Sequence, residues 1–435
     1  MTTVRVQPAG ALAGCLAVPP DKSITHRALL LGAVSDGEVV VDAPLESADT
    51  GATLGAVRAC RVAAEGRLGD RVTLQGAGLR GLRPPPLIDC ANAGTLMRLI
   101  PGLLVGQVCD HVVLDGDASL RRRPMQRVAR PLRAMGAEVF TAPGGTPPIA
   151  VSGGAPLRAM HHDLPVASAQ VKSCILLAGL FCDGETWVRE PAPSRDHTER
   201  MLAAAGAPVL RDGAAVGVRG PVERIALPSL RVPGDFSSAA FHLVAGALRG
   251  DPEVRLTGVN LNPARTGLLA VMARMGAGVR VEAGADVAGE PAGDLVVARA
   301  GTLQATEVAP EEVPALIDEL PLVGLLGAFA AGTTVVRGAG ELRVKESDRI
   351  ASVVAALRAM GARAEEREDG FQVTGAPRLA GGAVDAAGDH RLAMLGAVAG
   401  LASEGGVEVR GFDAAAVSYP GFAADLGALG ATVAP

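Results

Sequence analysis

Six long apolar segments, each introduced by a short polar cluster, give the chain its most regular pattern. The clusters recur at intervals of roughly 70–80 residues, which indicates an internal repeat. Asp, Ser and Asn are favoured at helix N-caps, so each cluster predicts the start of a helix. Because the apolar runs are nearly continuous, we expect these helices to be buried on almost every side. The clusters are Asp21-Lys22-Ser23, Asn92-Ala93-Gly94-Thr95, Ser168-Ala169-Gln170, Asp235-Phe236-Ser237-Ser238, Ile317-Asp318-Glu319 and Asp389-His390-Arg391.

A second repeat marks where another set of helices should end. An apolar residue is followed by three further residues and then by Gly-Ala, which is typical of an amphipathic helix stopped by glycine. Segments rich in Val, Thr or Ile follow most copies and predict strands. The copies cover residues 132–136, 202–206, 272–276, 357–361 and 426–430, with a degenerate sixth over 57–61.

Together the two repeats predict six copies of a strand–helix–strand–helix–strand unit of the βαβαββ type. Three copies fall in roughly 21–233 and three in 234–435. The first strand, over residues 3–18, would belong with the second half. We therefore expect an α/β protein with two similar lobes, one made of 1–20 plus 234–435 and the other of 21–233. Pro19-Pro20 and Pro233-Gly234 are the candidate hinges, near 20–21 and 233–234.

The polar helix starts have a functional consequence. A helix N-terminus presents unpaired N–H groups and a partial positive charge, so it is a ready site for an anion. If the repeats point several helix starts into one cleft, a protein with a net charge of −5 could still bind a highly anionic substrate. The alternative is that these residues only cap their helices.

Composition narrows the classes of function. Nucleic-acid binding usually needs a basic balance and stacking aromatics, whereas this chain is acidic and only 2% aromatic. Its six cysteines are scattered without a CxxC pair, which favours a reduced cytosolic protein without disulfides or a zinc site. His161-His162-Asp163 could bind a metal, although an isolated cluster of this kind more often belongs to the surface or the core.

No segment predicts a membrane span or a targeting peptide. Residues 320–336 form the longest apolar stretch, but Pro321 and three glycines interrupt it and favour a buried helix and turn. The first 20 residues lack a basic region followed by an apolar one, so we expect no signal peptide and a cytoplasmic location.

Lysine is scarce in this chain. Of 41 basic residues only Lys22, Lys172 and Lys345 are lysines, and the rest are arginines. An arginine-rich genome explains the bias. Under such a bias, a remaining lysine is a candidate for work that a guanidinium does poorly, such as releasing a proton or contacting a single oxygen.

Several clusters carry chemistry of their own. Ser23 and Arg27 lie on one helix face next to Lys22, and this set suits a phosphate or a carboxylate. Asp318-Glu319 could cap a helix or supply a catalytic carboxylate. Residues 76–81 match GxGxxG, but three prolines over 84–86 prevent a helix from starting there, so a dinucleotide site is rejected. Two further charged clusters precede expected helices, Arg121-Arg122-Arg123-Pro124 and Lys345-Glu346-Ser347-Asp348-Arg349.

These clusters, in order and across nearly the whole chain, resemble the motifs of the 3-phosphoshikimate 1-carboxyvinyltransferase family, also called 5-enolpyruvylshikimate-3-phosphate synthase. The resemblance implies a two-lobed inside-out α/β barrel with three repeats per lobe and a substrate cleft between the lobes. The matching segments are residues 20–27, Asn92-Ala93-Gly94-Thr95 with Met97-Arg98, residues 168–173, residues 194–200, residues 343–349 and Asp389-His390-Arg391.

The resemblance also implies an activity and a set of site residues. The carboxyvinyl group of phosphoenolpyruvate would pass to the 5-hydroxyl of shikimate-3-phosphate, a step toward chorismate and the aromatic amino acids. Shikimate-3-phosphate would be held by Lys22, Ser23, Arg27, Ser168, Gln170, Ser194, Arg195, Asp318 and Lys345. Phosphoenolpyruvate, and the inhibitor glyphosate in its place, would be held by Lys22, Gly94, Arg123, Gln170, Arg349 and Arg391.

Three of these residues would carry the chemistry. The reaction needs a base for the 5-hydroxyl, an acid for the methylene carbon and cations for two phosphates and a carboxylate. The resemblance makes Asp318 the group acting on the hydroxyl, Glu346 the candidate proton donor and Lys22 a contact to both substrates. It implies no metal or organic cofactor, small-molecule partners only, and we expect a monomer.

Two departures and two alternatives accompany the resemblance. Many relatives carry a lysine near the C-terminus, where this chain reads Ala416-Val417-Ser418-Tyr419-Pro420 without a lysine. The second departure is Glu341, at a position where some relatives have an asparagine near the sugar phosphate. The nearest alternative, UDP-N-acetylglucosamine 1-carboxyvinyltransferase, typically has Lys-Asn where this chain has Lys22-Ser23. A non-catalytic repeat protein that binds anions is an alternative of another class, but it would not need Asp318 and Glu346 beside basic groups.

Overall fold

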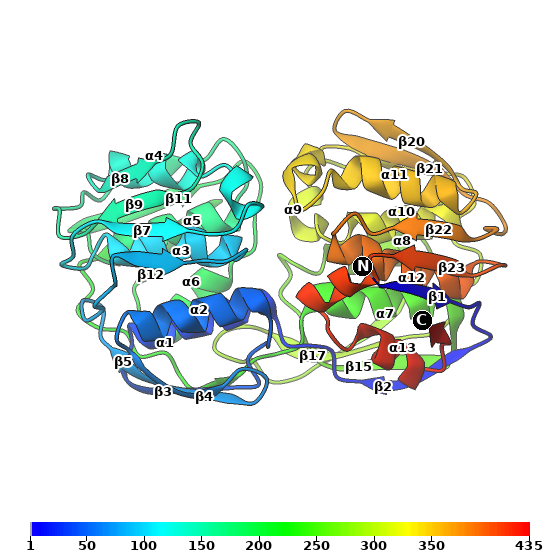
Figure 1. Cartoon of the computed structure of the whole chain (residues 1–435), viewed down its shortest axis with the longest axis horizontal. Coiled ribbons are helices and arrows are strands. Elements are labelled where there is room, and N and C mark those ends of the chain that lie inside the picture. Colours follow the sequence, from blue (N-terminus) through cyan, green and yellow to red (C-terminus); the bar gives the residue numbers. More distant parts are fainter. Residues whose placement is uncertain (1) are drawn as a thin grey trace. The chain divides into compact units, whose positions relative to one another are not determined.

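The computed structural model describes residues 2–435, and its chain divides into two compact units (Figure 1). Unit 1 contains the chain up to Pro19, Pro233–Ala285 and Pro291–Pro435, and unit 2 contains Pro20–Val232 and Asp286–Glu290. Each unit has its own hydrophobic core. The segment 286–290 packs with unit 2 although its neighbours along the chain belong to unit 1.

Six four-stranded sheets, three in each unit, share one strand order within the described residues. In each sheet the first two strands are parallel and the other two pairs are antiparallel, as for β6 with β7, β7 with β9, and β9 with β8. The predicted α/β fold of six βαβαββ-type repeats is therefore confirmed. The strands of this example are β6 (Leu87–Asp89), β7 (Val112–Asp115), β9 (Ile149–Ser152) and β8 (Glu138–Thr141).

The remaining sheets follow in the same order of strands. In unit 2 they are β14 (Leu230–Arg231), β3 (Asp36–Asp42), β5 (Arg71–Ala77) and β4 (Ala63–Arg67), and β10 (His161–Asp163), β11 (Gly184–Arg189), β13 (Ala215–Gly220) and β12 (Val209–Asp212). The first sheet of unit 1 contains β2 (Leu12–Leu16), β15 (Gly250–Asn260), β17 (Ala292–Val297) and β16 (Val279–Ala283). The second contains β18 (Glu307–Val308), β19 (Thr333–Val336), β21 (Gly370–Thr374) and β20 (Arg363–Arg367). The third contains β22 (Gly382–Asp385), β23 (Val407–Arg410), β1 (Thr3–Val6) and β24 (Val433–Ala434).

The prediction of one strand over residues 3–18 was wrong. Two strands form there, and they belong to different sheets of unit 1, β1 beside β23 and β2 beside β15. Pro8 lacks a backbone N–H, and Gly10 is flexible, so the sequence between the two strands cannot continue a ladder. In unit 2 the late strand β14 pairs with β3 and completes the first sheet.

Six helices fill the cores, as predicted, and each begins at one of the polar clusters. In α12, for example, every residue except Arg391 is buried. The near-continuous apolar sequences are explained by this burial, because these helices expose almost no polar face. The buried helices are α1 (Lys22–Ala33), α3 (Gly94–Leu104) and α5 (Ala169–Gly179) in unit 2, and α7 (Phe236–Arg249), α10 (Leu320–Ala328) and α12 (His390–Ala402) in unit 1.

A second set of helices ends where the Gly-Ala repeat predicts. Gly361 follows α11 with a φ of +93°, a left-handed conformation that suits glycine. In the degenerate copy after α2, Arg61 adopts the same conformation with a φ of +64°. These helices are α2 (Ala48–Ala59), α4 (Gln126–Ala134), α6 (His197–Ala204), α8 (Gly267–Arg274), α11 (Arg349–Ala359) and α13 (Phe422–Ala428). The chain also forms the short helix α9 (Val313–Leu316) and the 3₁₀ turns η1 (Leu120–Arg122), η2 (Gly340–Val344) and η3 (Phe412–Val417).

The apolar stretch 320–336 forms α10, a turn and then β19, so a strand completes the predicted helix and turn. Among residues 2–435, no helix combines the length and the hydropathy needed to cross a membrane.

Candidate functional site

In unit 2 the starts of three buried helices meet. Arg27 of α1 donates from Nη2 to the Ser173 hydroxyl of α5 at 3.0 Å. Gln170 of α5 donates to Thr95 of α3 at 3.0 Å and accepts from Arg98 at 2.8 Å. The sequence clusters around Lys22, Gly94 and Gln170 are thus brought together by the fold, which places cations and helix N-termini side by side.

The capping of these helix starts differs. The Asp21 carboxylate accepts the Ile24 N–H and caps α1. Neither Ala93 nor Ser168 caps its helix through a side-chain hydrogen bond. The first N–H groups of α3 and α5 are therefore not satisfied by a side-chain cap, and these two starts carry three predicted contacts, Gly94, Ser168 and Gln170.

Lys22 lies beside a carboxylate that the sequence did not indicate. Its Nζ is 3.1 Å from Oδ2 of Asp49 in α2, and the two side chains are 26% and 13% exposed. Burial alone would raise the pKa of the Asp49 carboxyl, but the neighbouring Lys22 and His26 lower it below its ordinary value. Asp49 therefore stays ionised and helps to orient the ammonium group.

Arg27 is buried among donors and acceptors of its own unit. Its Nε donates to the Thr198 hydroxyl at 2.7 Å and its Nη1 to the Ser23 carbonyl at 3.0 Å. Burial lowers the pKa of this arginine to about 10, an effect that Glu199 partly offsets, so the guanidinium is still charged at neutral pH. A rigid, buried cation at a helix start is a preorganised anion contact.

The three consecutive arginines after β7 separate into different roles. Arg121 pairs with Asp115 at 2.6 Å on the surface. Arg123 donates to Asn92 Oδ1 at 2.7 Å, beside the start of α3. A Cβ built on Gly94 would lie 3.0 Å from Nη1 of both Arg123 and Arg98, so two guanidinium groups closely face this glycine. Only Arg123 of the triplet thus joins the predicted phosphoenolpyruvate contacts.

Ser168 and Ser194 share one buried carboxylate. Glu190, which follows β11, accepts the backbone N–H of Ser168 at 2.7 Å and the hydroxyl of Ser194 at 2.7 Å. Lys172 of α5 pairs with Glu190 at 2.7 Å and with Glu199 at 2.9 Å. Burial alone would lower the pKa of Lys172, but the two carboxylates raise it above its ordinary value. Glu190 belongs to no motif, so the sequence analysis did not predict it.

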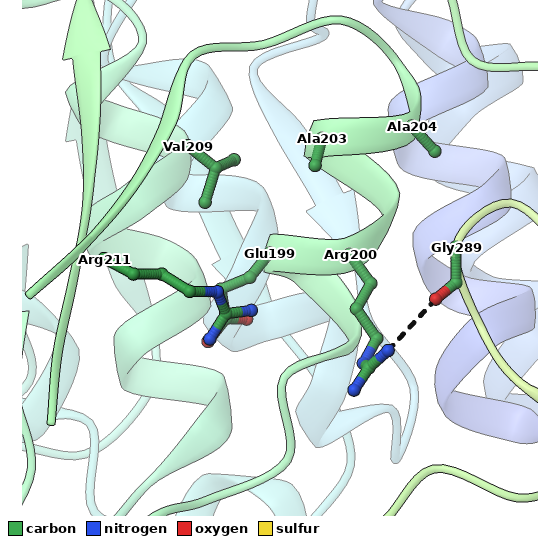
Figure 2. Close-up of a pocket in the computed structure, with 7 residues that line it drawn as sticks. All are labelled: Glu199, Arg200, Ala203, Ala204, Val209, Arg211 and Gly289. Carbon is green, nitrogen blue, oxygen red and sulfur yellow. Dashed lines mark hydrogen bonds between the residues drawn. The ribbon is translucent and has the colours of Figure 1, made fainter. Parts of the chain in front are cut away.

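Unit 2 also holds a surface cavity of about 480 Å³ beside α6, shown in Figure 2. Glu199, Arg200 and Arg211 line it, and Arg200 donates to the carbonyl of Gly289 at 3.2 Å. That bond, together with the hydrogen bond between His197 Nδ1 and Glu290 Oε1 at 2.8 Å, joins the segment 286–290 to α6. None of the predicted substrate contacts lines this cavity.

In unit 1 four of the predicted site residues, Asp318, Glu346, Arg349 and Arg391, form one cluster of ion pairs. Arg349 Nη1 is 3.3 Å from Asp318, and its Nη2 is 2.6 Å from Glu346. Arg391 lies 3.6 Å from Asp318 on its other side and donates to the Asp318 carbonyl at 3.3 Å. The fold thus brings together both predicted catalytic carboxylates and two predicted cations.

Asp389 contacts both arginines of this cluster. It is fully buried, caps α12 through the Arg391 N–H and pairs with Arg349 Nε at 2.7 Å. Burial alone would raise the pKa of Asp389, but Arg349 lowers it; the pKa of Arg349 is in turn raised, against its own burial, by Glu346 and Asp389. Sequence reasoning found the cap but not the ion pair.

The cap expected from Asp318-Glu319 does not form through a side chain of the N-cap residue, because Glu319 makes no side-chain cap hydrogen bond at the start of α10. Asp318 is 12% exposed and faces the arginines. Glu319 is fully buried and accepts a short hydrogen bond from Ser237 at the start of α7. Glu319 is thus held in the core and lies 3.9 Å from Arg391, whereas Asp318 contacts both Arg349 and Arg391. Lys345, between η2 and α11, is half-buried next to Glu346.

In the C-terminal segment without lysine, Ala416, Val417 and Pro420 are exposed and Tyr419 alone of residues 416–420 lies in the core. Tyr419 is 1% exposed; its hydroxyl donates to Asp425 at 2.6 Å and lies 2.8 Å from Nε2 of His242. Burial, reinforced by Asp425, raises the pKa of Tyr419. This tyrosine is therefore a neutral core residue and does not replace the cation that many relatives place nearby.

The histidines over 161–162 lie on β10, where His162 is buried and His161 stacks near Trp187. Within residues 2–435, no group of three or more His, Cys, Asp or Glu side chains could hold a metal ion.

Comparisons with known proteins agree with this geometry. The EPSP synthase (3-phosphoshikimate 1-carboxyvinyltransferase) family model matches residues 6–426. A 3-phosphoshikimate 1-carboxyvinyltransferase from Halorhodospira halophila is 48% identical over 98% of this chain and 96% of its own length. The relative of that name from Gloeobacter violaceus is 49% identical over 96% of each chain.

Solved structures give the same result. EPSP synthase from Acinetobacter baumannii superposes with a TM-score of 0.89 at 40% identity, and the match covers all of both chains. The enolpyruvyl transferase NikO from Streptomyces tendae has a TM-score of 0.78 at 19% identity over 99% of this chain and 98% of its own, which shows a common fold. From its sequence and its fold, the chain belongs to the EPSP synthase (3-phosphoshikimate 1-carboxyvinyltransferase) family.

Proposed function

We propose that the protein transfers the carboxyvinyl group of phosphoenolpyruvate to the 5-hydroxyl of shikimate-3-phosphate and releases phosphate. The observation that carries this proposal is near-half identity to 3-phosphoshikimate 1-carboxyvinyltransferases over 98% of the chain. The clusters within each unit support it, because they supply fixed cations beside carboxylates. The reaction is a step in aromatic amino-acid biosynthesis, and we place it in the cytoplasm and in a monomer.

The chemistry is an addition followed by an elimination. The 5-hydroxyl oxygen attacks carbon 2 of phosphoenolpyruvate and loses its proton, while the methylene carbon gains one. The tetrahedral intermediate then loses a proton from the new methyl group and expels phosphate, which restores the double bond. The net reaction moves protons, the carboxyvinyl group and phosphate without oxidation or reduction, so positioned acids, bases and cations suffice, and we propose that no cofactor takes part.

We assign the substrate contacts by unit. In unit 2, Lys22, Ser23, Arg27, Ser168, Gln170, Ser194 and Arg195 bind shikimate-3-phosphate, and Lys22, Gly94, Arg123 and Gln170 bind phosphoenolpyruvate. In unit 1, Asp318 and Lys345 bind shikimate-3-phosphate, and Arg349 and Arg391 bind phosphoenolpyruvate. The uncapped starts of α3 and α5 support the anion contacts in unit 2.

Asp318 and Glu346 are assigned the proton transfers. Asp318 lies between Arg349 and Arg391, an arrangement that favours a carboxylate and hence an acceptor for the hydroxyl proton. Glu346 is 32% exposed and lies 2.6 Å from Arg349, and its exposure suits a group that exchanges protons with solvent. Lys22, held by Asp49, stabilises the charge that develops on the intermediate.

The near-half identity to 3-phosphoshikimate 1-carboxyvinyltransferases over 98% of the chain argues against the UDP-N-acetylglucosamine enzyme, in which a cysteine loop is usually reactive. Burial raises the pKa of Cys90 and of Cys174 to about 12, so both thiols stay protonated and unreactive at neutral pH.

A coupled assay of phosphate release tests the proposal. The protein is incubated with phosphoenolpyruvate and either shikimate-3-phosphate or UDP-N-acetylglucosamine as acceptor. Release with shikimate-3-phosphate only is the expected result. Release with the sugar nucleotide would favour the related transferase, and binding of both anions without release would favour a non-catalytic binding protein. Asp318→Asn is the matched control, since it should bind substrates but lose turnover.

A further inference from the structure

Lys172 and Glu190 form a buried ion pair that contacts two proposed phosphate ligands. Their charged atoms are 2.7 Å apart, and both side chains are 5% exposed. Buried ion pairs often contribute little net stability because both charges lose their hydration, so stability alone is a weak reason for this one. Its neighbours suggest another role: Glu190 touches Ser168, which precedes α5, and Ser194, which precedes α6.

The surroundings of the Glu190 carboxylate consist of donors. Ser168 supplies a backbone N–H, Ser194 a hydroxyl and Lys172 an ammonium group, each at 2.7 Å. A carboxylate accepts all three, whereas an amide of the same shape has a single oxygen and a donating NH₂ group. Replacement by glutamine would therefore set donor against donor and separate the segments that Glu190 joins.

Lys172 holds the second segment independently of the Ser194 side chain. Its Nζ donates to the carbonyl of Ser194 at 3.3 Å while it pairs with Glu190. The Ser194 hydroxyl has one proton, so it must leave Glu190 to donate to a phosphate oxygen. After that turn, the Ser168 N–H and Lys172 still satisfy Glu190, and both segments keep their places.

We propose that Glu190 is a positioning residue which, through Lys172, holds Ser168 and Ser194 at the spacing that binds the phosphate group of shikimate-3-phosphate. This inference rests on the proposed function, which makes both serines ligands of that phosphate. Glu190 does not itself touch the substrate, and as an anion close to a phosphate it would repel it. Positioning and simple repulsion therefore predict opposite effects when the charge is removed.

Glu199 offers a matched control. It pairs with the same ammonium group at 2.9 Å, and its side chain is 1% exposed against 5% for Glu190, but the hydrogen bonds to Ser168 and Ser194 are made by Glu190. Glu190→Gln and Glu199→Gln each remove one carboxylate charge from Lys172. Only the first disturbs the two serines.

The experiment measures the Kd of shikimate-3-phosphate and of unphosphorylated shikimate by calorimetry, with kcat at saturating substrates. For Glu190→Gln we expect at least about a tenfold weaker Kd for shikimate-3-phosphate, the loss of about one charge-assisted hydrogen bond, with little change for shikimate. The kcat at saturation should stay within about threefold of wild type, because positioning of the ground-state phosphate is lost rather than proton transfer. Glu199→Gln should leave both Kd values within about threefold of wild type, because Arg27, on which Glu199 also acts, is held by its own hydrogen bonds to Thr198 and Ser23.

Three results would overturn the inference: tighter binding by Glu190→Gln, equal effects of the two variants, or an equal loss for shikimate and its phosphate. A thermal melt verifies that each variant folds. If Glu190→Gln does not fold, Glu190→Asp takes its place; it keeps the charge but withdraws it by about 1.5 Å, and a wild-type Kd would then contradict positioning. Wild-type protein that binds no shikimate-3-phosphate would overturn the proposed function as well.

Discussion

Adding one methyl group at Gly94 should weaken phosphoenolpyruvate binding without unfolding the protein. Gly94 is the first residue of α3, and its backbone is helical, so alanine fits there without strain. Its new Cβ, however, would lie 3.0 Å from Nη1 of both Arg123 and Arg98. Non-bonded carbon contacts are favourable only beyond about 3.5 Å, so each guanidinium has to withdraw by roughly 0.5 Å.

The size of the effect follows from how the two arginines are held. Arg123 is bonded to Asn92 at 2.7 Å and Arg98 to Gln170 at 2.8 Å. A displacement of about 0.5 Å stretches these bonds only to the edge of the normal range, so unfolding free energy should change by less than about 1 kcal/mol. The anion loses two well-placed donors in part, which should cost about 1–2 kcal/mol, or roughly a five- to thirtyfold higher KM.

The assay is phosphate release at saturating shikimate-3-phosphate over a range of phosphoenolpyruvate concentrations, repeated with glyphosate as a competitor. Gly94→Ala should raise the KM for phosphoenolpyruvate, raise the inhibition constant of glyphosate at least as much, and leave the Tm within a few degrees. Gly55→Ala in α2 is the matched control, because a Cβ there meets no atom within 4 Å. An unchanged KM in Gly94→Ala, or the same shift in Gly55→Ala, would refute the reasoning.

Three further predictions concern charge. Lys22→Arg keeps the charge beside Asp49 but not the compact ammonium group. The activation free energy should rise by about 3 kcal/mol, which lowers kcat, and the Tm should be unchanged. A variant that keeps most of its turnover would limit Lys22 to binding. Asp389→Asn leaves the buried Arg349 without its closest carboxylate, and urea denaturation should show a loss of about 3 kcal/mol, whereas a loss below about 1 kcal/mol would contradict the role of the pair. Burial lowers the pKa of His242 to about 3, so the contribution of the neutral imidazole to stability is complete above pH 6.5 and is lost as the pH falls toward 3. The unfolding free energy should drop by about 1.4 kcal/mol between pH 7.5 and 5.5. His242→Gln should remove this part of the pH dependence.

The fold was largely readable from the sequence because its signals are local. Helix starts depend on capping residues such as Asp21, and helix ends on glycines such as Gly361, so both repeat with the units they delimit. Arg61 shows the limit of that rule, since it takes the left-handed conformation without being a glycine. The break between β1 and β2 was missed because both strands lie in one short apolar stretch and pair with sheets formed much later in the chain.

The candidate site was predictable in its cations but not in their partners. Arg349 and Asp318 stood out in charged clusters at helix starts, and the structure brings them together. Asp49 and Glu190 are single acids without a motif, and their distance along the chain from Lys22 and from Lys172 gives no indication of contact. Each pair joins two elements of one repeat that meet only when the chain is folded, so these pairings cannot be derived from local patterns.

The N-terminal strands β1 and β2 pair with strands from later parts of the chain, and this pairing determines the order in which the two units can fold during synthesis. Residues 20–232 contain all three sheets of unit 2, including the closing strand β14, so these sheets can assemble as soon as they emerge, and the segment 286–290 joins them later. The strands β1 and β2 are synthesised first, yet β23 and β15, their partners, come more than two hundred residues later. During synthesis these two strands keep unpaired edges, the kind of surface that trigger factors and other chaperones protect. Nascent chains stopped before β15 should therefore carry a protease-resistant unit 2 and a cleavable N-terminus.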